Sequence, residues 1–397
     1  MKILFMGYAV NQQFNYKLSG RSDAGNKFEL GILKELNSNV EKLDIITIYP
    51  IAAFPKDKAV YKKGKYIDIG YGMKSYRVGF CNIPFIKQIT QIWAVYKHAS
   101  AIIEDNEDTI VVPFNMYPQT GLPAIFLKKK CGCRVVPILA DLPIDDNYNR
   151  KGIGKIVRSV FNSITAWTIK QMDEVIVLNK YAHDVFAPQS DYIVVDGGLE
   201  PQDIISGNPK TNFSDGKKHI VYTGSLAEYS GIVEMVRAMD LVHDEDVVLD
   251  IYGGGGMEKW IAERAGRNVC FHGSVSNSDA IEAQRAAWLL VNPRSPEDEI
   301  AKVTFPSKIF EYMYSGTPVL STRLNGFTPE YEDKLFFAEN NKPETLARAV
   351  TSIAALPERD LLSRAQKAKR YIESEKNWTY QVRRILSFLN GGNMETE

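Results

Sequence analysis

A lysine and a glutamate at the start of one predicted helix are the residues in this sequence best suited to bind a charged ligand. The stretch from Asn292 to Thr322, NPRSPEDEIAKVTFPSKIFEYMYSGTPVLST, contains a helical pattern over Pro306–Ser315. Lys308 and Glu311 fall in its first turns. A carboxylate placed there can accept two hydroxyl groups of a ribose, and a lysine beside free N–H groups can hold a diphosphate.

The faces of this helix separate its apolar side chains from its polar ones. Ser307, Glu311 and Tyr314 share one face at spacings of four and three, and Thr304 is the expected N-cap. The alternative is that Lys308 and Glu311 form an exposed pair on an ordinary amphipathic helix.

A run of glycines, Tyr252-Gly253-Gly254-Gly255-Gly256, follows a predicted strand and precedes a predicted helix. Without side chains the backbone there can come close to a flat ligand. The spacing is not Gly-x-Gly-x-x-Gly, which disfavours a nicotinamide site. A tight turn with no ligand is the alternative.

A second small-residue loop, Gly20-Arg21-Ser22-Asp23-Ala24-Gly25-Asn26-Lys27, opens the first long helix. Its spacing does not fit the phosphate-binding loop of ATP-binding proteins. The N–H groups of Gly20 and Gly25 are candidates for contacting an anion. The alternative is a loop that only caps the helix through Ser22 or Asp23.

Short apolar runs alternate with helical patterns along the whole chain, which predicts parallel sheets covered by helices. The predicted strands are 3–7, 43–49, 109–113, 135–139, 174–178, 192–195, 219–223, 247–252, 269–272, 288–292 and 318–322. The predicted helices are 24–36, 83–104, 119–129, 154–171, 181–186, 231–239, 257–265, 277–286 and 306–315, followed by a tail that is almost all helical over 342–389.

Three segments interrupt or qualify this alternation. The stretch from Gly197 to Gly216, GGLEPQDIISGNPKTNFSDG, indicates a linker. Residues 55–82 indicate a loop or a short hairpin. The helix beginning at Ile83 is apolar nearly all round, which favours a buried helix over a surface that touches lipid. Two doubly wound α/β domains joined near residue 200 are therefore predicted, with the cleft between them as the expected binding site.

Composition limits the class of protein. The chain has 397 residues, 48 basic and 48 acidic, so its net charge is zero and nucleic acid is not an expected partner. Four cysteines suit a reducing compartment, and no window is apolar enough to span a membrane. The predicted location is the cytoplasm. The basic stretch 56–65 or the helix at 83–96 leaves open a peripheral contact with the inner face of the membrane.

The segment FPSKIFEYMYSGTPVLST resembles the nucleotide-sugar motif of the retaining GT-B glycosyltransferases of family 4 (glycosyltransferase group 1), especially those that build bacterial exopolysaccharide and capsule. The segments IVYTGSLAEYSGIVEMVRAM, LDIYGGGG and VCFHGSVSNSDAIEAQRAAWLLVNP are similar to successive units of the donor domain. SGRSDAGNKFELGILKEL resembles the N-terminal loop and helix, and Asn377-Trp378-Thr379-Tyr380 the final helix.

The resemblance implies a GT-B fold with three parts: an acceptor-binding Rossmann-like domain over 1–200, a donor-binding one over 201–376, and a C-terminal helix over 377–397 that returns to the first domain. It implies that the donor is bound by Gly20, Gly25, Gly224, Ser225, Tyr252, Gly253, Gly254, Gly273, Ser274, Val275, Arg294, Ser307, Lys308 and Glu311.

The resemblance also assigns roles to single positions. Glu311 matches the second acid of the family's paired glutamates, which holds the donor ribose, whereas Val303 stands at the place of the first. Glu297 or Glu299 is the expected substitute. Asp141 occupies the place of a polar residue near the reacting sugar, with a turn-forming role as its alternative.

Two positions where the family carries an arginine and a lysine for the diphosphate are Ser225 and Ser230 in this chain. Arg294 and Lys308 are the candidates to replace that charge. Asp141, Lys308 and Glu311 are therefore the expected catalytic residues, without a metal or another cofactor.

The activity implied is transfer of a sugar from a UDP- or GDP-sugar to a saccharide, which is expected to be lipid-linked, with the anomeric configuration retained. Two alternatives stay open. A sugar-nucleotide epimerase shares the two-domain fold, and a non-catalytic subunit that binds a nucleotide sugar would explain Val303, Ser225 and Ser230.

Overall fold

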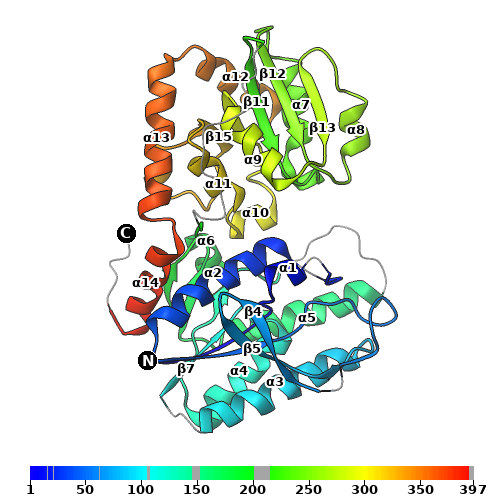
Figure 1. Cartoon of the computed structure of the whole chain (residues 1–397), viewed down its shortest axis with the longest axis vertical. Coiled ribbons are helices and arrows are strands. Elements are labelled where there is room, and N and C mark those ends of the chain that lie inside the picture. The colour runs from blue at the N-terminus through cyan, green and yellow to red at the C-terminus, as the bar shows by residue number, and fades with distance from the viewer. Residues whose placement is uncertain are drawn as a thin grey trace. The chain divides into compact units, whose positions relative to one another are not determined.

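The computed structural model describes residues 1–15, 17–20, 22–61, 63–104, 108–144, 153–200 and 215–392. It divides into two compact units: unit 1 is Met1–Gly197 with Trp378–Glu397, and unit 2 is Gly198–Asn377 (Figure 1). The sequence predicts domain boundaries after residues 200 and 376, and the two units of the structure meet after residues 197 and 377. Most of the predicted linker, residues 201–214, lies outside the described residues.

A five-stranded sheet lies at the centre of unit 1, in the order β4-β5-β2-β1-β7. Its strands are β1 (Lys2–Gly7), β2 (Lys42–Thr47), β4 (Lys65–Gly70), β5 (Met73–Arg77) and β7 (Thr109–Pro113). β1 pairs in parallel with β2 and β7, and β2 pairs in parallel with β5. The edge strand β4 runs antiparallel to β5. All five residues of β7 are buried, as in a strand covered by helices on both faces.

Three more strands extend this layer. β8 (Ile138–Leu139), β9 (Glu174–Val177) and β10 (Asp191–Val194) pair in parallel in the order β10-β9-β8. Single bridges from Val111 to Val135 and from Phe114 to Ile138 connect them to β7. The strand predicted over 135–139 is shortened to β8, because Pro137 has no N–H to continue the ladder.

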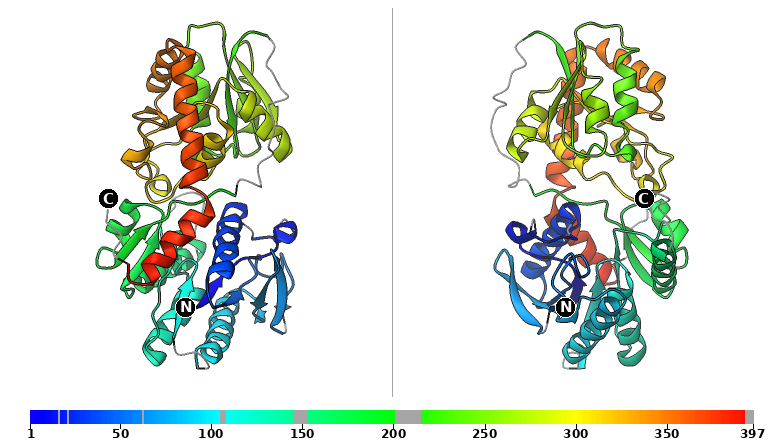
Figure 2. Two further views of the ribbon diagram at one scale, coloured as in Figure 1. Left: turned by 60° about the vertical axis from the view of Figure 1, so that its left-hand side comes forward. Right: turned by 90° about the vertical axis from the view of Figure 1, so that its right-hand side faces the viewer.

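The helices of unit 1 cover both faces of its sheets. They are α1 (Gln12–Asn15), α2 (Asp23–Asn39), α3 (Ile86–Glu104), α4 (Pro118–Cys131), α5 (Ile153–Ile169), α6 (Lys180–Phe186) and α14 (Trp378–Leu389). Ile3 and Phe5 of β1 pack with α2 and α14. Leu4 and Met6 alternate with them and are buried toward the opposite face, where α3, α4 and α5 pack side by side (Figure 2).

The C-terminal helix α14 belongs to unit 1 because it packs on α2. The ring of Trp378 lies edge-on to Phe28, with ring centres 5.0 Å apart. A Cβ atom at Gly31 would lie 2.2 Å from Nε1 of Trp378, so only glycine leaves room for the indole.

Unit 2 contains one parallel sheet in the order β13-β12-β11-β14-β15-β16. Its strands are β11 (Lys218–Thr223), β12 (Val247–Tyr252), β13 (Val269–Gly273), β14 (Leu289–Asn292), β15 (Val319–Thr322) and β16 (Phe336–Ala338). The order steps outward in both directions from β11, which is the arrangement of a doubly wound sheet.

Helices cover both faces of this sheet as well. The described ones are α7 (Ile232–Met239), α8 (Glu258–Ala262), α9 (Asn277–Ala286), α10 (Glu299–Val303), α11 (Lys308–Ser315), α12 (Pro343–Ala354) and α13 (Glu358–Ser374). Residues of α7, α8 and α12 form the core on one face, and residues of α9, α11 and α13 form the core on the other.

Some elements differ from the sequence-based expectation or make it more precise. The 55–82 segment, expected as a loop or a short hairpin, forms two antiparallel pairs, β4 with β5 and β3 (Val60–Tyr61) with β6 (Phe80–Cys81). β16 and α10 were not predicted, because three and five residues are too short to show a period. Thr304 ends α10 and is not the N-cap of α11, a position that Ser307 holds without a side-chain bond.

Candidate functional site

The residues predicted to bind the donor in unit 2 follow neighbouring strands of its sheet. The carboxyl ends of parallel strands lie at one edge, where ligands bind in doubly wound folds. The loops after β11, β12, β13 and β14 and the first turns of α11 begin there. This strand-end site carries Gly224, Ser225, Tyr252, Gly253, Gly254, Gly273, Ser274, Val275, Arg294, Ser307, Lys308 and Glu311.

Glycines let the loops of this site pack backbone against backbone. Gly224 and Gly253 have φ of 142° and 147°, values that side chains rarely permit. A Cβ atom on Gly253 would lie 1.8 Å from the carbonyl oxygen of Gly224, and one on Gly254 would lie 2.5 Å from Oγ of Ser274. The run of glycines therefore brings three loops together and leaves few side chains at the strand ends.

Lys308 enters the site from the first turn of α11. Its Nζ donates a 2.8 Å hydrogen bond to the carbonyl oxygen of Thr223, the last residue of β11. A Cβ atom on Gly224 would lie 2.3 Å from the same Nζ, so this glycine makes room for the ammonium group. Lys308 thus contacts the strand ends, unlike a lysine that only pairs along an exposed helix surface.

The charge of Lys308 is stabilised by its neighbours. Burial by itself would lower the pKa of Lys308, but nearby tyrosines and Glu311 outweigh burial, and the pKa lies above its ordinary value. The ammonium group lies 4.2 Å from the centre of the Tyr222 ring. Glu311 is partly buried one turn further along α11. The helix therefore presents a fixed cation with a carboxylate beside it.

Arg294 supplies a second cation in the loop after β14, the strand next to β11. Burial lowers the pKa of Arg294 below its ordinary value, although Asp298 and the nearby tyrosines act in the opposite direction. The guanidinium lies 5.5 Å from the centre of the Tyr229 ring and 3.5 Å from a carboxylate oxygen of Asp298. Within the described part of the chain, Nε of Arg294 is buried without a hydrogen-bond partner. An anionic ligand would offset the cost of that burial.

Asp298 is a site residue that the sequence analysis missed. It caps α10, because its carboxylate accepts a 2.8 Å hydrogen bond from the N–H of Ala301, and it also pairs with Arg294. The signal was present, since an aspartate before a short apolar run is a common N-cap. The helix that Asp298 caps was not recognised from the sequence, because α10 has only five residues.

The place expected for a first acid is part of the core. Val303 is 3% exposed. Of the two expected substitutes, Glu299 is paired with Lys302 at 2.8 Å on the exposed side of α10, and Glu297 follows Ser295 in the preceding loop. Nothing in the described residues directs Glu299 to the strand-end site, and its role as a substitute stays a prediction.

The two serines at the expected cation positions differ in exposure. Ser225 is exposed, and its carbonyl oxygen accepts a 2.7 Å hydrogen bond from the Tyr222 hydroxyl. Ser230 is buried, and its hydroxyl donates to the carbonyl oxygen of Ala227 at 2.6 Å. Ser230 therefore shapes its own turn, and positive charge at the site comes from Lys308 and Arg294.

A buried carboxylate orients the Tyr252 end of the site. Asp250 lies between two histidines, 2.6 Å from Nδ1 of His219 and 2.7 Å from Nε2 of His272. The His272 ring stacks on Tyr252 with centres 4.3 Å apart and planes 6° apart. These contacts join three neighbouring strands, so they could be predicted only once the strand order was known.

An Asp-x-Asp triplet, Asp244-Glu245-Asp246, also occurs in unit 2, and two carboxylates so spaced can share a cation. It lies before β12, at the amino ends of the strands. Asp244 pairs with Lys218 at 2.9 Å. The triplet is therefore at the opposite edge of the sheet from the strand-end site.

The two glycines of unit 1 predicted to contact the donor have their N–H groups engaged. Gly20 donates to the carbonyl oxygen of Pro50 at 3.0 Å, and Gly25 donates to Oγ of Ser22 at 3.1 Å. Ser22 is the N-cap of α2. The structure thus shows the capping alternative, and an anion at Gly25 would have to replace this cap.

Asp141 follows β8 and is held by its neighbours in unit 1. The hydroxyl of Tyr117 donates to its carboxylate at 2.9 Å. Oδ1 of Asn115 accepts the N–H groups of Ala140 and Asp141, both at 2.8 Å, and Asn115 itself has a left-handed φ of 60°. This buried asparagine fixes the loop, so the exposed carboxylate of Asp141 has a defined position.

Glu29 is a buried carboxyl group of unit 1 that no sequence signal indicated. One of its oxygens accepts the N–H groups of Tyr8 and Ala9 after β1, at 2.7 and 3.1 Å. Gly7 has no side chain, and a Cβ atom there would lie 2.1 Å from that oxygen. Burial raises the pKa of Glu29 to about 8, although these N–H groups act in the opposite direction.

Glu29 predicts a pH dependence of stability. Since its pKa is about 8 in the folded chain and near 4.5 when unfolded, folding takes up a proton between these values. The stabilisation is complete below about pH 4.5 and is lost as the pH rises toward 8. Glu29→Gln, which cannot ionise, should gain thermal stability relative to wild type as pH rises from 5 to 9 in calorimetric scans. Glu35→Gln, at a partly exposed position of the same helix, should show no such trend.

Comparisons with known proteins agree with the predicted class of unit 2. Residues 217–355 match the family model of the glycosyl transferases group 1. WcaI of Escherichia coli (strain K12), whose name describes a colanic acid biosynthesis glycosyl transferase, is 26% identical over 173 residues. That alignment spans 41% of this chain and 41% of the relative, which is less than half of either protein.

Solved structures show that the fold of the chain is the GT-B fold. The sucrose-phosphate synthase of Thermosynechococcus elongatus is similar with a TM-score of 0.68 and 14% identity, over 98% of this chain and 99% of that one. The trehalose-phosphate synthase of Burkholderia vietnamiensis has a TM-score of 0.69 and 9% identity, over 98% of this chain and 100% of that one. Anabaena HepE in complex with UDP-glucose has a TM-score of 0.62 and 13% identity, over 98% of this chain and 100% of that one.

Proposed function

We propose that this chain moves a sugar from a nucleotide-diphosphate sugar, with UDP or GDP as the nucleotide, to a hydroxyl group of a saccharide. The observation that carries the proposal is Lys308 beside Tyr222 at glycine-lined strand ends, with a second cation, Arg294, in the loop after the neighbouring strand β14. Glu311 on the same helix as Lys308 is suited to the ribose hydroxyls. The family match of residues 217–355 supports the same class.

The proposed chemistry follows from the charge that develops as the sugar leaves. Negative charge grows on the departing diphosphate, and fixed cations that are already desolvated stabilise it without reorganisation. Lys308 and Arg294 fill this role, so the reaction as proposed uses no metal or other cofactor. The proposal assigns no side chain as nucleophile, and it includes retention of the anomeric configuration, as in family 4.

The acceptor is proposed to be a lipid-linked saccharide in the synthesis of a bacterial cell-surface polysaccharide, either capsule or exopolysaccharide. Similarity to WcaI, whose name describes colanic acid biosynthesis, supports this choice. The UDP-glucose held by the Anabaena protein of the same fold supports a nucleotide-sugar donor. In the proposal the protein acts in the cytoplasm, at the inner face of the membrane.

A non-catalytic subunit that binds a nucleotide sugar is the second candidate. The buried Val303 and the inward-turned Ser230 favour it, because both replace charged residues expected of an enzyme. The purified chain is incubated with UDP- and GDP-sugars and with lipid-linked saccharides, and products are followed by mass spectrometry. A longer saccharide supports the enzyme, whereas binding without product supports the subunit. Conversion of the donor sugar with no acceptor present would indicate an epimerase.

Asp141 is proposed to act on the reacting sugar or on the acceptor. Asp141→Asn should lower kcat/KM by roughly 10²-fold, the size typical of a lost acid–base or charge interaction, and leave UDP affinity unchanged. Asn115→Ala removes the hydrogen bonds that hold the loop of Asp141. It should lower kcat/KM less than Asp141→Asn does, because Asn115 acts only by positioning Asp141. The control is Asp173→Asn, an exposed residue of the same unit paired with Lys128. Full activity of Asp141→Asn would limit this residue to a role in the turn.

A further inference from the structure

The start of α3 exposes large apolar side chains. Phe85, Ile89 and Trp93 are 66, 67 and 62% exposed, and Ile86 lies on the same side of the helix as Ile89 and Trp93. The expectation of a buried helix is therefore wrong for this side, while Val95 and Ala99 on the other side are fully buried. Phe85 also has a left-handed φ of 67°, an unfavourable conformation for an aromatic residue.

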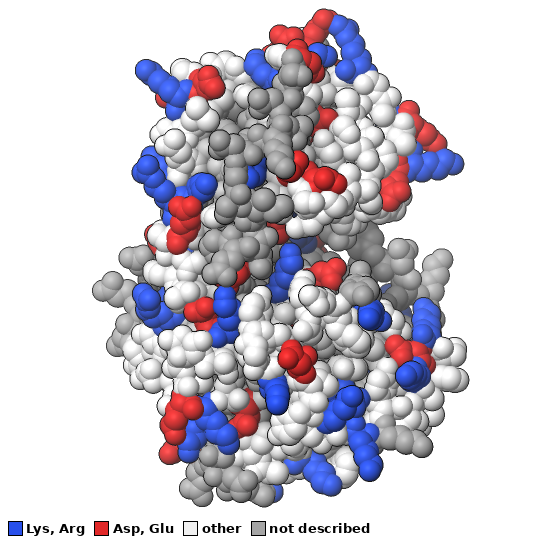
Figure 3. Space-filling model, viewed as in Figure 1, with Lys and Arg blue, Asp and Glu red and all other residues white. Residues whose placement is uncertain are grey.

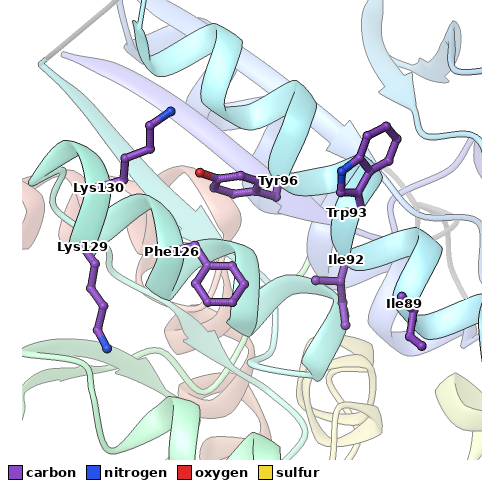
Figure 4. A pocket seen from close by; sticks show the side chains of 7 residues that line it. All are labelled: Ile89, Ile92, Trp93, Tyr96, Phe126, Lys129 and Lys130. Atoms are coloured by element: carbon purple, nitrogen blue, oxygen red, sulfur yellow. The ribbon is translucent and has the colours of Figure 1, made fainter.

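The exposed side of α3 continues onto α4. A shallow hollow between the two helices is lined by Ile89, Ile92, Trp93, Tyr96, Phe126, Lys129 and Lys130 (Figure 4). The rings of Tyr96 and Phe126 meet edge to face, with centres 5.9 Å apart. We call the exposed side of these helices, with Phe85 at its end, the α3–α4 surface.

A second apolar and basic segment borders the start of α3. Asn82 accepts the N–H of Phe54 at 2.9 Å, and its own N–H donates to Ala59 at 2.7 Å. Its side chain donates to the carbonyl oxygen of Lys58 at 2.8 Å. Phe54 and Val60 are themselves exposed. The stretch 56–65 and the helix at 83–96, two separate options for membrane contact in the sequence, therefore adjoin one another.

The charge of this surface is mainly basic, although the chain as a whole is neutral. The sequences of α3 and α4 contain five lysines, Lys87, Lys97, Lys128, Lys129 and Lys130, against one acidic residue, Glu104. Of these lysines, Lys128 pairs with Asp173 at 2.7 Å, and Lys87 donates to the carbonyl oxygen of Ile51. Nζ of Lys97 lies 5.1 Å from the centre of the Trp93 ring. Figure 3 shows basic side chains among uncharged ones where these helices lie in unit 1.

We infer that the α3–α4 surface binds the face of a lipid bilayer that contains anionic phospholipid. Exposed Phe, Ile and Trp side chains suit the boundary between headgroups and acyl chains, and lysines beside them are attracted to anionic headgroups. None of the described helices is long and apolar enough to cross a membrane. The inference deepens the proposed function, because such contact would bring the chain to a lipid-linked acceptor, but it depends on none of the strand-end residues.

The test is co-sedimentation of the full chain with phosphatidylcholine vesicles, with and without phosphatidylglycerol, at low and high salt. Wild type should sediment with the anionic vesicles at low salt and dissociate as salt screens the lysines. Ile89→Ser/Trp93→Ser should weaken partitioning about tenfold or more. Lys129→Gln/Lys130→Gln should weaken it roughly 25-fold, about fivefold for each lysine. Leu362→Ser, exposed on a helix of unit 2, is the matched control.

Two results would overturn the inference. One is equal sedimentation of wild type and both double variants, and the other is no sedimentation of wild type with anionic vesicles at any salt concentration. A dimer in light scattering that the Ile89→Ser/Trp93→Ser variant abolishes, without vesicle binding, would assign the surface to a second copy. UDP binding by the same variants should stay at the wild-type level, so failure of the bilayer inference and failure of the proposed donor site are distinguishable.

Discussion

Lys308→Met is expected to lower kcat/KM for sugar transfer by roughly 10²–10³-fold, the size seen when one preorganised charge partner of a developing anion is removed. The reason is the position of Nζ, which Thr223 and the Tyr222 ring hold at the end of β11, next to Gly224. Methionine keeps the length and the apolar packing of the side chain but removes its charge. The loss should therefore appear mainly in kcat, measured with a saturating donor.

Controls separate this effect from loss of folding. Lys302→Met removes a lysine of the neighbouring helix α10 whose ammonium group lies 2.8 Å from a carboxylate oxygen of Glu299, and it should retain wild-type activity. Thermal unfolding of Lys308→Met should remain cooperative, with the small cost of one lost hydrogen bond to a charged group. Wild-type kcat in a folded Lys308→Met variant would contradict the role given to this lysine.

Glu311→Ala is expected to weaken UDP binding roughly 10- to 150-fold, which corresponds to about 1.5–3 kcal/mol for hydrogen bonds to a charged group. Glu311 lies one turn after Lys308, so a nucleotide whose diphosphate contacts Lys308 places its ribose within reach of this carboxylate. Binding of UDP to both proteins would be measured by titration calorimetry.

A comparison of nucleotides makes this prediction specific to the ribose. UDP should bind wild type more tightly than 2′-deoxy-UDP, and the two should bind Glu311→Ala about equally, because the partner of the hydroxyl group is gone. Glu299→Ala serves as the control and also tests Glu299 as a substitute acid. If Glu299→Ala and not Glu311→Ala removes the preference for UDP, the ribose belongs to Glu299.

Much of the fold could be predicted because the strands are short, apolar and regularly spaced. β7 and β12 were expected at the bounds that the structure gives them, and β1 and β11 within one residue. Helices such as α9, with a serine cap and a clear period, could be predicted in the same way. Their order along the chain then predicts a doubly wound sheet, since crossovers between parallel strands have a fixed hand.

Contacts between residues distant in sequence could not be predicted. Asp250 with His219 and His272, and Glu29 with the loop after β1, join segments whose register is fixed only by the folded sheet. A pattern shows which residues share a face, but not which residue opposes them on another strand or helix. The apolar run of α3 was misjudged for the same reason, because the pattern does not show which side of a helix a neighbour covers.

The sequence was sufficient to predict which edge of the unit 2 sheet carries the candidate site, but not all of the contacts within it. Glycine runs and polar residues at predicted strand ends indicated Gly253, Lys308 and Glu311, and the sheet order places them together in unit 2. The partner of Arg294 was missed because Asp298 belongs to a helix too short to recognise. For Gly25 the sequence left two roles open, and the structure shows the cap.

The most direct test of the central claim is titration calorimetry of the wild-type chain with UDP, GDP, ATP and NAD. A nucleotide-sugar site formed by Lys308, Arg294 and Glu311 predicts micromolar affinity for UDP or GDP, with ATP and NAD markedly weaker. The same titration of Glu311→Ala should show the loss described above. Tighter binding of ATP or NAD, or UDP and GDP binding that is unchanged in both Lys308→Met and Glu311→Ala, would contradict the assignment of the strand-end site.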